Sequence, residues 1–159
     1  MLDGMPTKIE QGAVTASVGR FASARFGWSV TAGGIVAGNV GRGGTLGVQG
    51  SYLAAYDSPD HPFLAFTFSA SGSITDADYS SFDGRIGATA GKAISRFVPY
   101  VALRLFGGPV FYNDASGGDR YHVTIGAGSV VRLPANLDAT LEVMPLGERS
   151  IAVGVSLHR

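Results

Sequence analysis

The sequence predicts an all-β fold, a closed antiparallel up-and-down transmembrane β-barrel of eight strands. Three observations carry this prediction. Polarity alternates with a period of two over long segments, clusters of Gly, Pro, Asp and Ser separate these segments, and only 15% of the residues are charged. Soluble domains usually carry about 25% charged residues. The pattern therefore indicates a sheet with one face in hydrocarbon rather than in water.

The composition limits the classes of protein to which the chain can belong. Its 159 residues are enough for one domain, and we expect a barrel over 13–159 after an N-terminal segment, 1–12, that is disordered or part of an extra strand. Twelve basic and twelve acidic residues cancel, so no electrostatic footprint for nucleic acid exists. The absence of cysteine excludes disulfides and thiolate metal sites. No signal peptide is visible, and no apolar run reaches the roughly 18 residues of a membrane-spanning helix.

Nine segments have the length and alternation of strands. Most contain ten residues or more, which suits a tilted membrane strand of about 9–11 residues, whereas soluble strands usually have about five or six. Single-chain membrane barrels have an even number of strands. We therefore prefer eight strands, with two segments merged or one outside the wall, and keep ten as the alternative if residues 2–11 add one. The segments are 13–22, 26–38, 44–56, 63–74, 82–94, 98–112, 119–133, 136–144 and 150–158.

The alternation predicts which side chains face lipid. In segment 119–133, Val123 and Ile125 share one face, while Thr124 and Gly126 share the other. A soluble sandwich needs charge on its outer face, yet here the second face is mostly Gly, Ala, Ser and Thr. We expect the large apolar side chains to point outward, and small residues to line the inside of the curved sheet.

Charged residues on the second face are candidates for a polar network in the lumen. An isolated buried charge costs several kcal/mol, so these groups must pair or be hydrated. We predict that Arg104 and Glu142 belong to one network. The candidate lumen residues are Asp83, Arg85, Arg104, His122, Arg132, Asp138 and Glu142.

Aromatic residues gather where strands meet turns. In a membrane barrel such rings form two girdles at the depth of the lipid headgroups. Ordinary packing at hairpin ends is the alternative interpretation. The candidate girdle residues are Phe21, Phe26, Trp28, Tyr56, Phe97, Tyr100, Tyr112 and Tyr121.

Two stretches carry a resemblance to a known class of protein. They are PYVALRLFGGPV at 99–110 and MPLGER at 144–149, and they resemble the last hairpins of outer-membrane β-barrel proteins of Gram-negative bacteria. The resemblance is to uncharacterised myxobacterial barrels, and the sequence is recognisably similar only over residues 98–158. It implies the fold and the location of the protein but no activity. One departure is the end of the chain, SLHR at 156–159, which lacks the terminal aromatic residue that the assembly machinery reads.

No motif indicates catalysis, a cofactor or a metal ion. His61, His122 and His158 stand in unrelated contexts without a nucleophile motif, so we expect no enzyme activity. Neither His61 nor His122 has further ligands at a usable spacing for a metal. The loop aspartates, Asp76, Asp78, Asp114 and Asp119, lack the spacing of a calcium loop.

Three functional hypotheses remain. The first is a small outer-membrane barrel with a largely filled lumen and a structural or loop-mediated role, whose loops 75–81 and 113–119 contact an extracellular partner. The second is a narrow channel or transporter, which requires a continuous polar path past Arg85 and Arg104. The third is a soluble lipocalin-like barrel whose apolar face points inward around an apolar ligand. In the first two, membrane lipid is the main partner.

Overall fold

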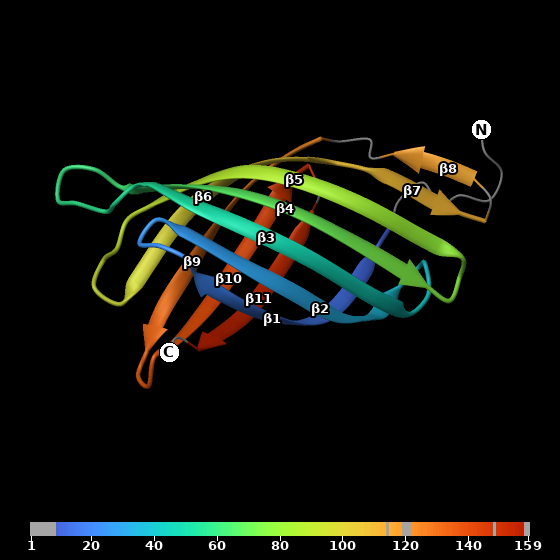
Figure 1. The fold of residues 1–159 in the computed structure, drawn as a ribbon, viewed down its shortest axis with the longest axis horizontal. Helices are drawn as coiled ribbons and strands as arrows, with labels where there is room; N and C mark the ends of the chain where they lie inside the picture. The colour runs from blue at the N-terminus through green and yellow to red at the C-terminus, as the bar shows by residue number, and fades with distance from the viewer. Residues whose placement is uncertain (1–8, 114, 119–121, 148, 158–159) are drawn as a thin grey trace. The chain divides into compact units, whose positions relative to one another are not determined.

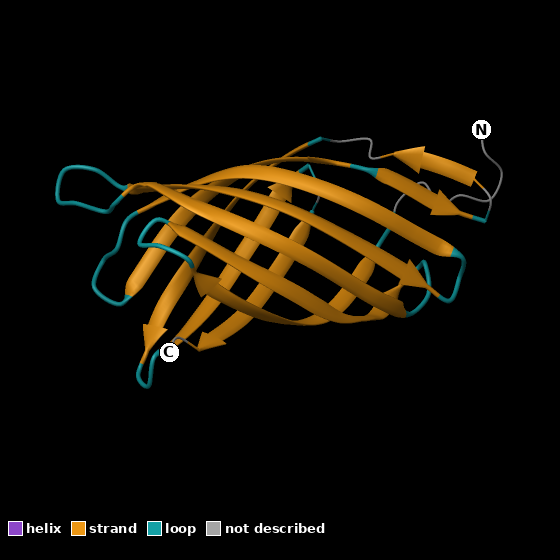
Figure 2. Cartoon of the chain, in the orientation of Figure 1, coloured by secondary structure: helices purple, strands orange, loops and turns teal. Residues whose placement is uncertain are grey.

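The computed structural model describes residues 9–113, 115–118, 122–147 and 149–157. All regular structure in these ranges is β-strand (Figure 2), and none of them forms a helix long and apolar enough to span a membrane. The strands are β1 (Gln11–Phe21), β2 (Phe26–Gly38), β3 (Gly43–Ala55), β4 (Phe63–Thr75), β5 (Tyr79–Gly91), β6 (Phe97–Gly107), β7 (Pro109–Tyr112), β8 (Ala115–Gly118), β9 (Val123–Leu133), β10 (Leu137–Leu146) and β11 (Ser150–Leu157).

The strands belong to one antiparallel sheet. Nine of them follow the order β1-β2-β3-β4-β5-β6-β9-β10-β11, so neighbours in the chain are mostly neighbours in the sheet. The short strands β7 and β8 form a hairpin, and β7 pairs with the start of β5 (Figure 1). The chain divides into two compact units, the first comprising Met1–Gly50, Phe68–Arg85 and Gly107–Arg120, the second the remaining segments.

The nine strands of the main order correspond to the nine predicted segments. The two ends of β2, Phe26 and Gly38, are those predicted, and the other boundaries mostly differ by a few residues. The largest difference is in the predicted strand 98–112, which is interrupted at Gly108. A Cβ there would collide with the carbonyl oxygen of Phe82, because the backbone lies close against β5, with which β7 pairs directly after this residue.

The finer prediction of a closed eight-strand wall is not confirmed. The sheet order ends at β1 and β11, and no two predicted segments merge. Our preference for eight came from the even strand numbers of closed barrels and not from the turns, which separate nine strands. The ten-strand alternative relied on residues 2–11, of which 2–8 lie outside the described residues and 9–10 are not in a strand.

The predicted loops are also shorter than expected. Residues 75–81 contain only a three-residue turn, Asp76–Asp78, because β4 ends at Thr75 and β5 begins at Tyr79. Asp78 occupies the left-handed region with φ of 52°, which aspartate tolerates better than most residues. The segment 113–119 is largely the β7–β8 hairpin, although Asp114 and Asp119 lie outside the described residues.

Turn geometry keeps the strands of the second unit in register. Ala135 and Asn136, between β9 and β10, have φ of 63° and 58°. Leu133 pairs directly with Leu137, so three residues, Pro134, Ala135 and Asn136, form the turn. Positions of the same parity therefore stay on the same face in β9 and β10.

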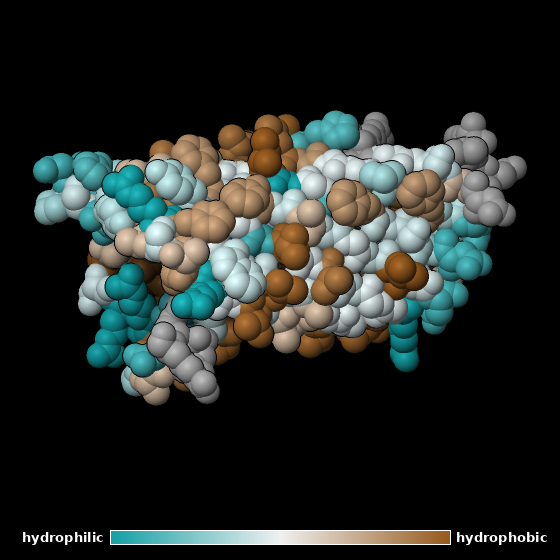
Figure 3. Space-filling model, viewed as in Figure 1, coloured by the Kyte–Doolittle hydropathy of each residue, from teal (hydrophilic) through white to brown (hydrophobic). Residues whose placement is uncertain are grey.

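Burial confirms the predicted orientation of the two faces. In β6, Leu103 is 46% exposed, whereas its neighbour Ala102 is 2% exposed. Val123, Leu141 and Val153 are 45%, 47% and 79% exposed, so they do not pack in a dry centre. Brown, hydrophobic side chains accordingly stand on the surface over the strands in Figure 3. We call the side of the sheet that carries these residues the apolar face, and the opposite side the small-residue face.

Hydroxyl groups satisfy one another on the small-residue face of the first unit. Ser73 and Ser81, on β4 and β5, are hydrogen-bonded at 3.0 Å, and Ser17 and Thr31, on β1 and β2, at 2.6 Å. These bonds link neighbouring strands in addition to the backbone ladder. The small-residue face is thus polar but largely uncharged in this unit.

Adjacent glycines in β3 provide a test of the packing. A Cβ at Gly43 would collide with the carbonyl oxygen of Ile74 and lie 2.6 Å from Thr75 Cα, whereas at Gly44 the nearest atom, the carbonyl oxygen of Gly33, is 3.9 Å away. We predict that Gly43→Ala lowers the free energy of unfolding by about 1–3 kcal/mol. Gly44→Ala should change it by less than about 0.5 kcal/mol. Urea titration of the refolded protein measures both values, and equal effects would contradict the assigned faces.

Candidate functional site

A cluster of three polar side chains lies on the small-residue face of the second unit. The guanidinium group of Arg104 donates two parallel hydrogen bonds to the carboxylate of Glu142, from Nη1 to Oε1 at 2.8 Å and from Nη2 to Oε2 at 2.6 Å. The hydroxyl of Tyr100 donates to the same Oε2 at 3.0 Å. We call Tyr100, Arg104 and Glu142 the Arg104–Glu142 network. Its Arg–carboxylate geometry is bidentate, the arrangement that gives such pairs both strength and fixed orientation.

The network crosses a strand. Tyr100 and Arg104 lie on β6 and Glu142 on β10, while β9 runs between them. Gly128 of β9 is directly opposite both Tyr100 and Glu142 in the register, and a Cβ at Gly128 would collide with the Tyr100 ring. The glycine therefore opens the path by which the tyrosine hydroxyl reaches the carboxylate over the intervening backbone.

The partial burial of Arg104 and Glu142 determines how much the network contributes to the stability of the fold. The side chains of Arg104 and Glu142 are 27% and 14% exposed. Removing two charges from water is costly, and attraction between them offsets that cost only when the remaining hydrogen-bonding positions are also filled. Tyr100 fills one of these positions. The network is therefore better at fixing the register of β6, β9 and β10 than at adding net stability over an apolar replacement.

The prediction that Arg104 and Glu142 belong to one network is confirmed. Period-two counting placed both residues on the same face, but we did not predict that Tyr100 joins them. We assigned Tyr100 to the aromatic girdle, and this was wrong, since its ring lies on the small-residue face and its hydroxyl bonds to Glu142. The signal was present, because Tyr100 is four residues before Arg104 and a strand returns to the same face every second residue.

A second ion pair occurs in the first unit. Arg85 Nε bonds to Asp83 Oδ2, and the two residues are two positions apart on the same face of β5. The other carboxylate oxygen, Asp83 Oδ1, is buried and has no hydrogen-bond partner among the residues that the structure describes. Asp83 and Arg85, two of the predicted lumen residues, are thus paired with each other. Both lie on one strand, whereas the Arg104–Glu142 network joins different strands.

The remaining predicted lumen residues occupy less enclosed positions. His122 is exposed, and its Nδ1 lies 3.2 Å from the carbonyl oxygen of Phe106. Arg132 is also exposed and pairs in register with half-buried Asp138 near the ends of β9 and β10. The described residues contain no group of three or more His, Cys, Asp or Glu side chains that could hold a metal ion.

The predicted girdle residues lie in three kinds of environment. Phe21, Trp28, Tyr56 and Phe97 are exposed, as a girdle requires. Phe26 is partly buried and stacks on Phe68, with 6.2 Å between the ring centroids.

Tyr112 instead packs against a small buried cluster of Val40, Tyr79 and Val110. Tyr121 lies outside the described residues. A set chosen only for its closeness to turns thus mixes surface rings with rings that pack inside.

A lysine holds one connection against the sheet in the second unit. Lys92 Nζ lies 3.6 Å from Asp57 Oδ1 and donates to the carbonyl oxygens of Ser58 and Pro59, the latter at 3.1 Å. The backbone N–H of Ala93 donates to Asp57 Oδ2 at 3.2 Å. The β3–β4 connection is therefore fixed to the β5–β6 turn, and these contacts give Lys92 a structural role.

The Arg104–Glu142 network yields a prediction about stability. Glu142→Leu should lower the unfolding midpoint of the detergent-folded protein in urea, with a loss of up to about 3–5 kcal/mol, because the arginine charge stays partly buried without its partner. The double variant Arg104→Met/Glu142→Leu should recover part of the loss. Arg132→Met, at an exposed position on the same face, is the matched control. An unchanged midpoint for Glu142→Leu would refute the pairing.

Comparison with known proteins identifies no relative. No protein-family model matches the chain, and no curated protein and no solved structure matches it. The function is therefore inferred from the geometry of the two faces and of the Arg104–Glu142 network.

Proposed function

We propose that the chain is a small outer-membrane β-barrel protein of a Gram-negative bacterium, with a structural or loop-mediated interaction role and a largely filled lumen. The observation that carries the proposal is the exposed apolar face, which lies opposite a face of Gly, Ser, Thr and paired ions. The resemblance of residues 98–158 to the last hairpins of outer-membrane barrels agrees with it.

The free energy of the apolar face favours hydrocarbon over water as its surroundings. Each Å² of apolar surface left in water forgoes about 25 cal/mol, and soluble monomers seldom expose contiguous patches above a few hundred Å². Along β6, β9, β10 and β11 the described apolar-face positions include no charged residue. A water-exposed sheet would need charges there, whereas a lipid-facing one must exclude them.

The edge of the sheet at β11 supports the proposal that the sheet closes into a barrel in a membrane. In water, exposed edges are protected by charges, proline or bulges, but residues 150–156 of β11 contain neither a charge nor a proline. In hydrocarbon every backbone N–H and C=O group must be paired, so an open edge cannot persist. We propose that the wall closes there.

Side chains on the small-residue face favour a filled lumen over a channel. The Arg104–Glu142 network spans three strands, and Met144 and Phe106 on the same face are 2% and 9% exposed. A channel needs a continuous polar path, which these buried apolar groups interrupt in the second unit. The lipocalin-like alternative needs an inward apolar face, and the exposure of Leu103 and Leu141 argues against it.

The β7–β8 hairpin is the proposed contact for an extracellular partner. β7 pairs with the start of β5, β8 pairs with β7, and the described tip residue Asn113 is exposed. Its residues Ala115–Gly118 are small, so the hairpin offers backbone groups and few large side chains. A structural role of the barrel and a partner contact through this hairpin are compatible, so the proposal includes both.

A pair of leucine substitutions tests the membrane assignment. Lysine at the middle of a lipid-facing strand costs about 2–4 kcal/mol in a bilayer and about 0–1 kcal/mol near the interface. We predict that Leu141→Lys, in the middle of β10, destabilises the vesicle-inserted protein by the larger amount. Leu133→Lys, beside the Pro134–Asn136 turn, should cost the smaller amount. In a soluble protein both exposed positions would tolerate lysine with a loss of stability within about 0.5 kcal/mol. Equal and small losses of stability for the two variants in the vesicle refolding assay would therefore contradict the membrane assignment.

Single-channel recording separates the filled lumen from the channel alternative. The protein inserted in planar bilayers should give no discrete current steps, because the Arg104–Glu142 network and its apolar neighbours obstruct the lumen. A single-chain porin inserted in the same bilayers is the positive control. Discrete steps from the unmodified protein would favour the channel.

A further inference from the structure

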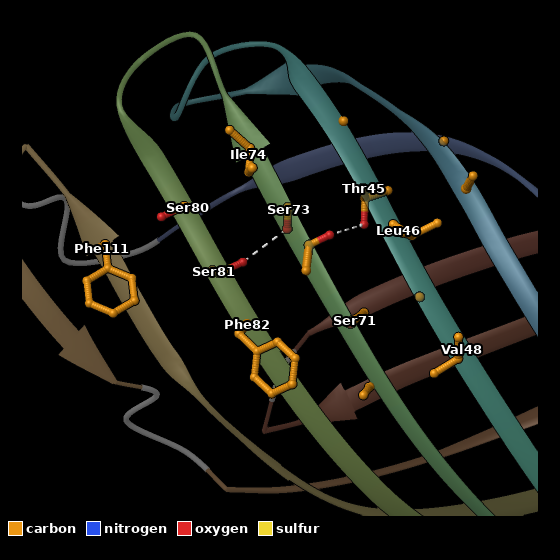
Figure 4. A pocket seen from close by; sticks show the side chains of 16 residues that line it. Thr45, Leu46, Val48, Ser71, Ser73, Ile74, Ser80, Ser81, Phe82 and Phe111 are labelled. Carbon is orange, nitrogen blue, oxygen red and sulfur yellow. Dashed lines mark hydrogen bonds between the residues drawn. The ribbon is translucent and has the colours of Figure 1, made fainter.

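An open groove of about 760 Å³ lies on the first unit, within residues that the structure describes. It runs over β2 to β5 and reaches β7 (Figure 4). Leu46, Ile74, Phe82 and Phe111 form its walls (Figure 4). Gly44 and Gly72 also line the groove, and because they have no side chain we call them its floor. All four wall side chains are exposed members of the apolar face.

The floor glycines are not required by strand packing. A Cβ at Gly72 would have the carbonyl oxygen of Ser81 at 3.4 Å as its only near neighbour, and a Cβ at Gly44 would have only an atom at 3.9 Å. At Gly50 on the same face, by contrast, the Phe68 ring fills the space that a side chain would take. The groove therefore exists because two side chains are missing where there is room for them.

The lining defines the chemistry of the occupant. None of the residues lining the groove is charged. The hydroxyl of Thr45 donates to the carbonyl oxygen of Gly72 at 3.1 Å, and Ser73 and Ser81 bond to each other, so these polar groups are used within the sheet. Ser71 and Ser80 are the other residues of the lining with a hydroxyl group, so a charged or strongly polar ligand would lose more hydration than the groove replaces, whereas a hydrocarbon chain would not.

We infer that this groove seats one acyl chain of a membrane phospholipid. The inference rests on the proposed function, because the groove is continuous with the apolar face that is proposed to lie in the bilayer. Side walls of Leu46, Ile74, Phe82 and Phe111 give a chain contact on both flanks as well as on the floor. Dispersion attraction grows with the number of such contacts, so a chain in the groove is held more tightly than its neighbours on the flatter wall.

Tryptophan quenching by a labelled lipid tests the inference. The reporter is Phe111→Trp in a Trp28→Phe background, folded in detergent micelles and titrated with phosphatidylcholine brominated on its acyl chains. We expect saturable quenching at low lipid mole fraction. Adding Gly72→Leu, which fills the floor, should weaken the apparent affinity about tenfold or more, and Gly44→Val should do the same if Gly72→Leu fails to fold.

Gly84→Leu is the matched control, because a Cβ at Gly84 also has only one near atom, at 3.8 Å, and the residue does not line the groove. It should leave the quenching curve unchanged. Quenching that rises linearly and equally in all variants would overturn the inference. A dimer that Gly72→Leu converts to a monomer would also overturn it, since a second copy would then be the occupant.

The proposed function has its own readout in the same samples. A membrane barrel should require detergent and give a band whose gel mobility changes on boiling. Saturable quenching by a protein that stays monomeric in plain buffer would keep the acyl-chain groove and reject the outer-membrane proposal. A heat-modifiable protein with linear quenching would do the reverse.

Discussion

The constraint on which the structure depends is the separation of side chains between the two faces of one sheet. Most large apolar side chains stand on the exposed face, whereas Gly, Ser, Thr and paired ions stand on the other, together with a few buried apolar groups such as Phe106 and Met144. A strand places successive residues on opposite faces, so a slip of one residue would exchange the two sets. Long strands, short turns and cross-strand hydroxyl bonds all preserve this register. The burial pattern is therefore the inverse of that of an ordinary soluble sandwich.

Glycine has two distinct roles on this sheet. At Gly128 its missing side chain lets Tyr100 cross β9 and reach Glu142, so the glycine is part of the packing of the second unit. At Gly44 and Gly72 no neighbour occupies the space that a side chain would take, and a groove results. The same residue type thus serves close packing on one face and an unfilled surface on the other.

The charged groups are arranged to limit the cost of burying them. Arg104 and Glu142 satisfy each other bidentately, and Tyr100 adds a third hydrogen bond. Asp83 and Arg85 achieve a pair within one strand, although Oδ1 of Asp83 keeps no partner among the described residues. A cross-strand pair fixes the relative position of strands, whereas a pair within one strand does not. The network across β9 is therefore the polar feature most closely tied to the fold.

The sequence by itself determined the all-β class, the nine strands of the main order and the orientation of their faces, because period-two alternation and turn residues are local signals. It also placed Arg104 and Glu142 on one face. Only the tertiary structure decided that Tyr100 bonds to Glu142 and is not part of a girdle, and that Tyr112 packs beside Val40, Tyr79 and Val110. It also decided that Gly108 divides a predicted strand and that β1 and β11 end the sheet order. These features depend on which strands become neighbours and in what register, and residues distant in sequence carry no local signal of their pairing.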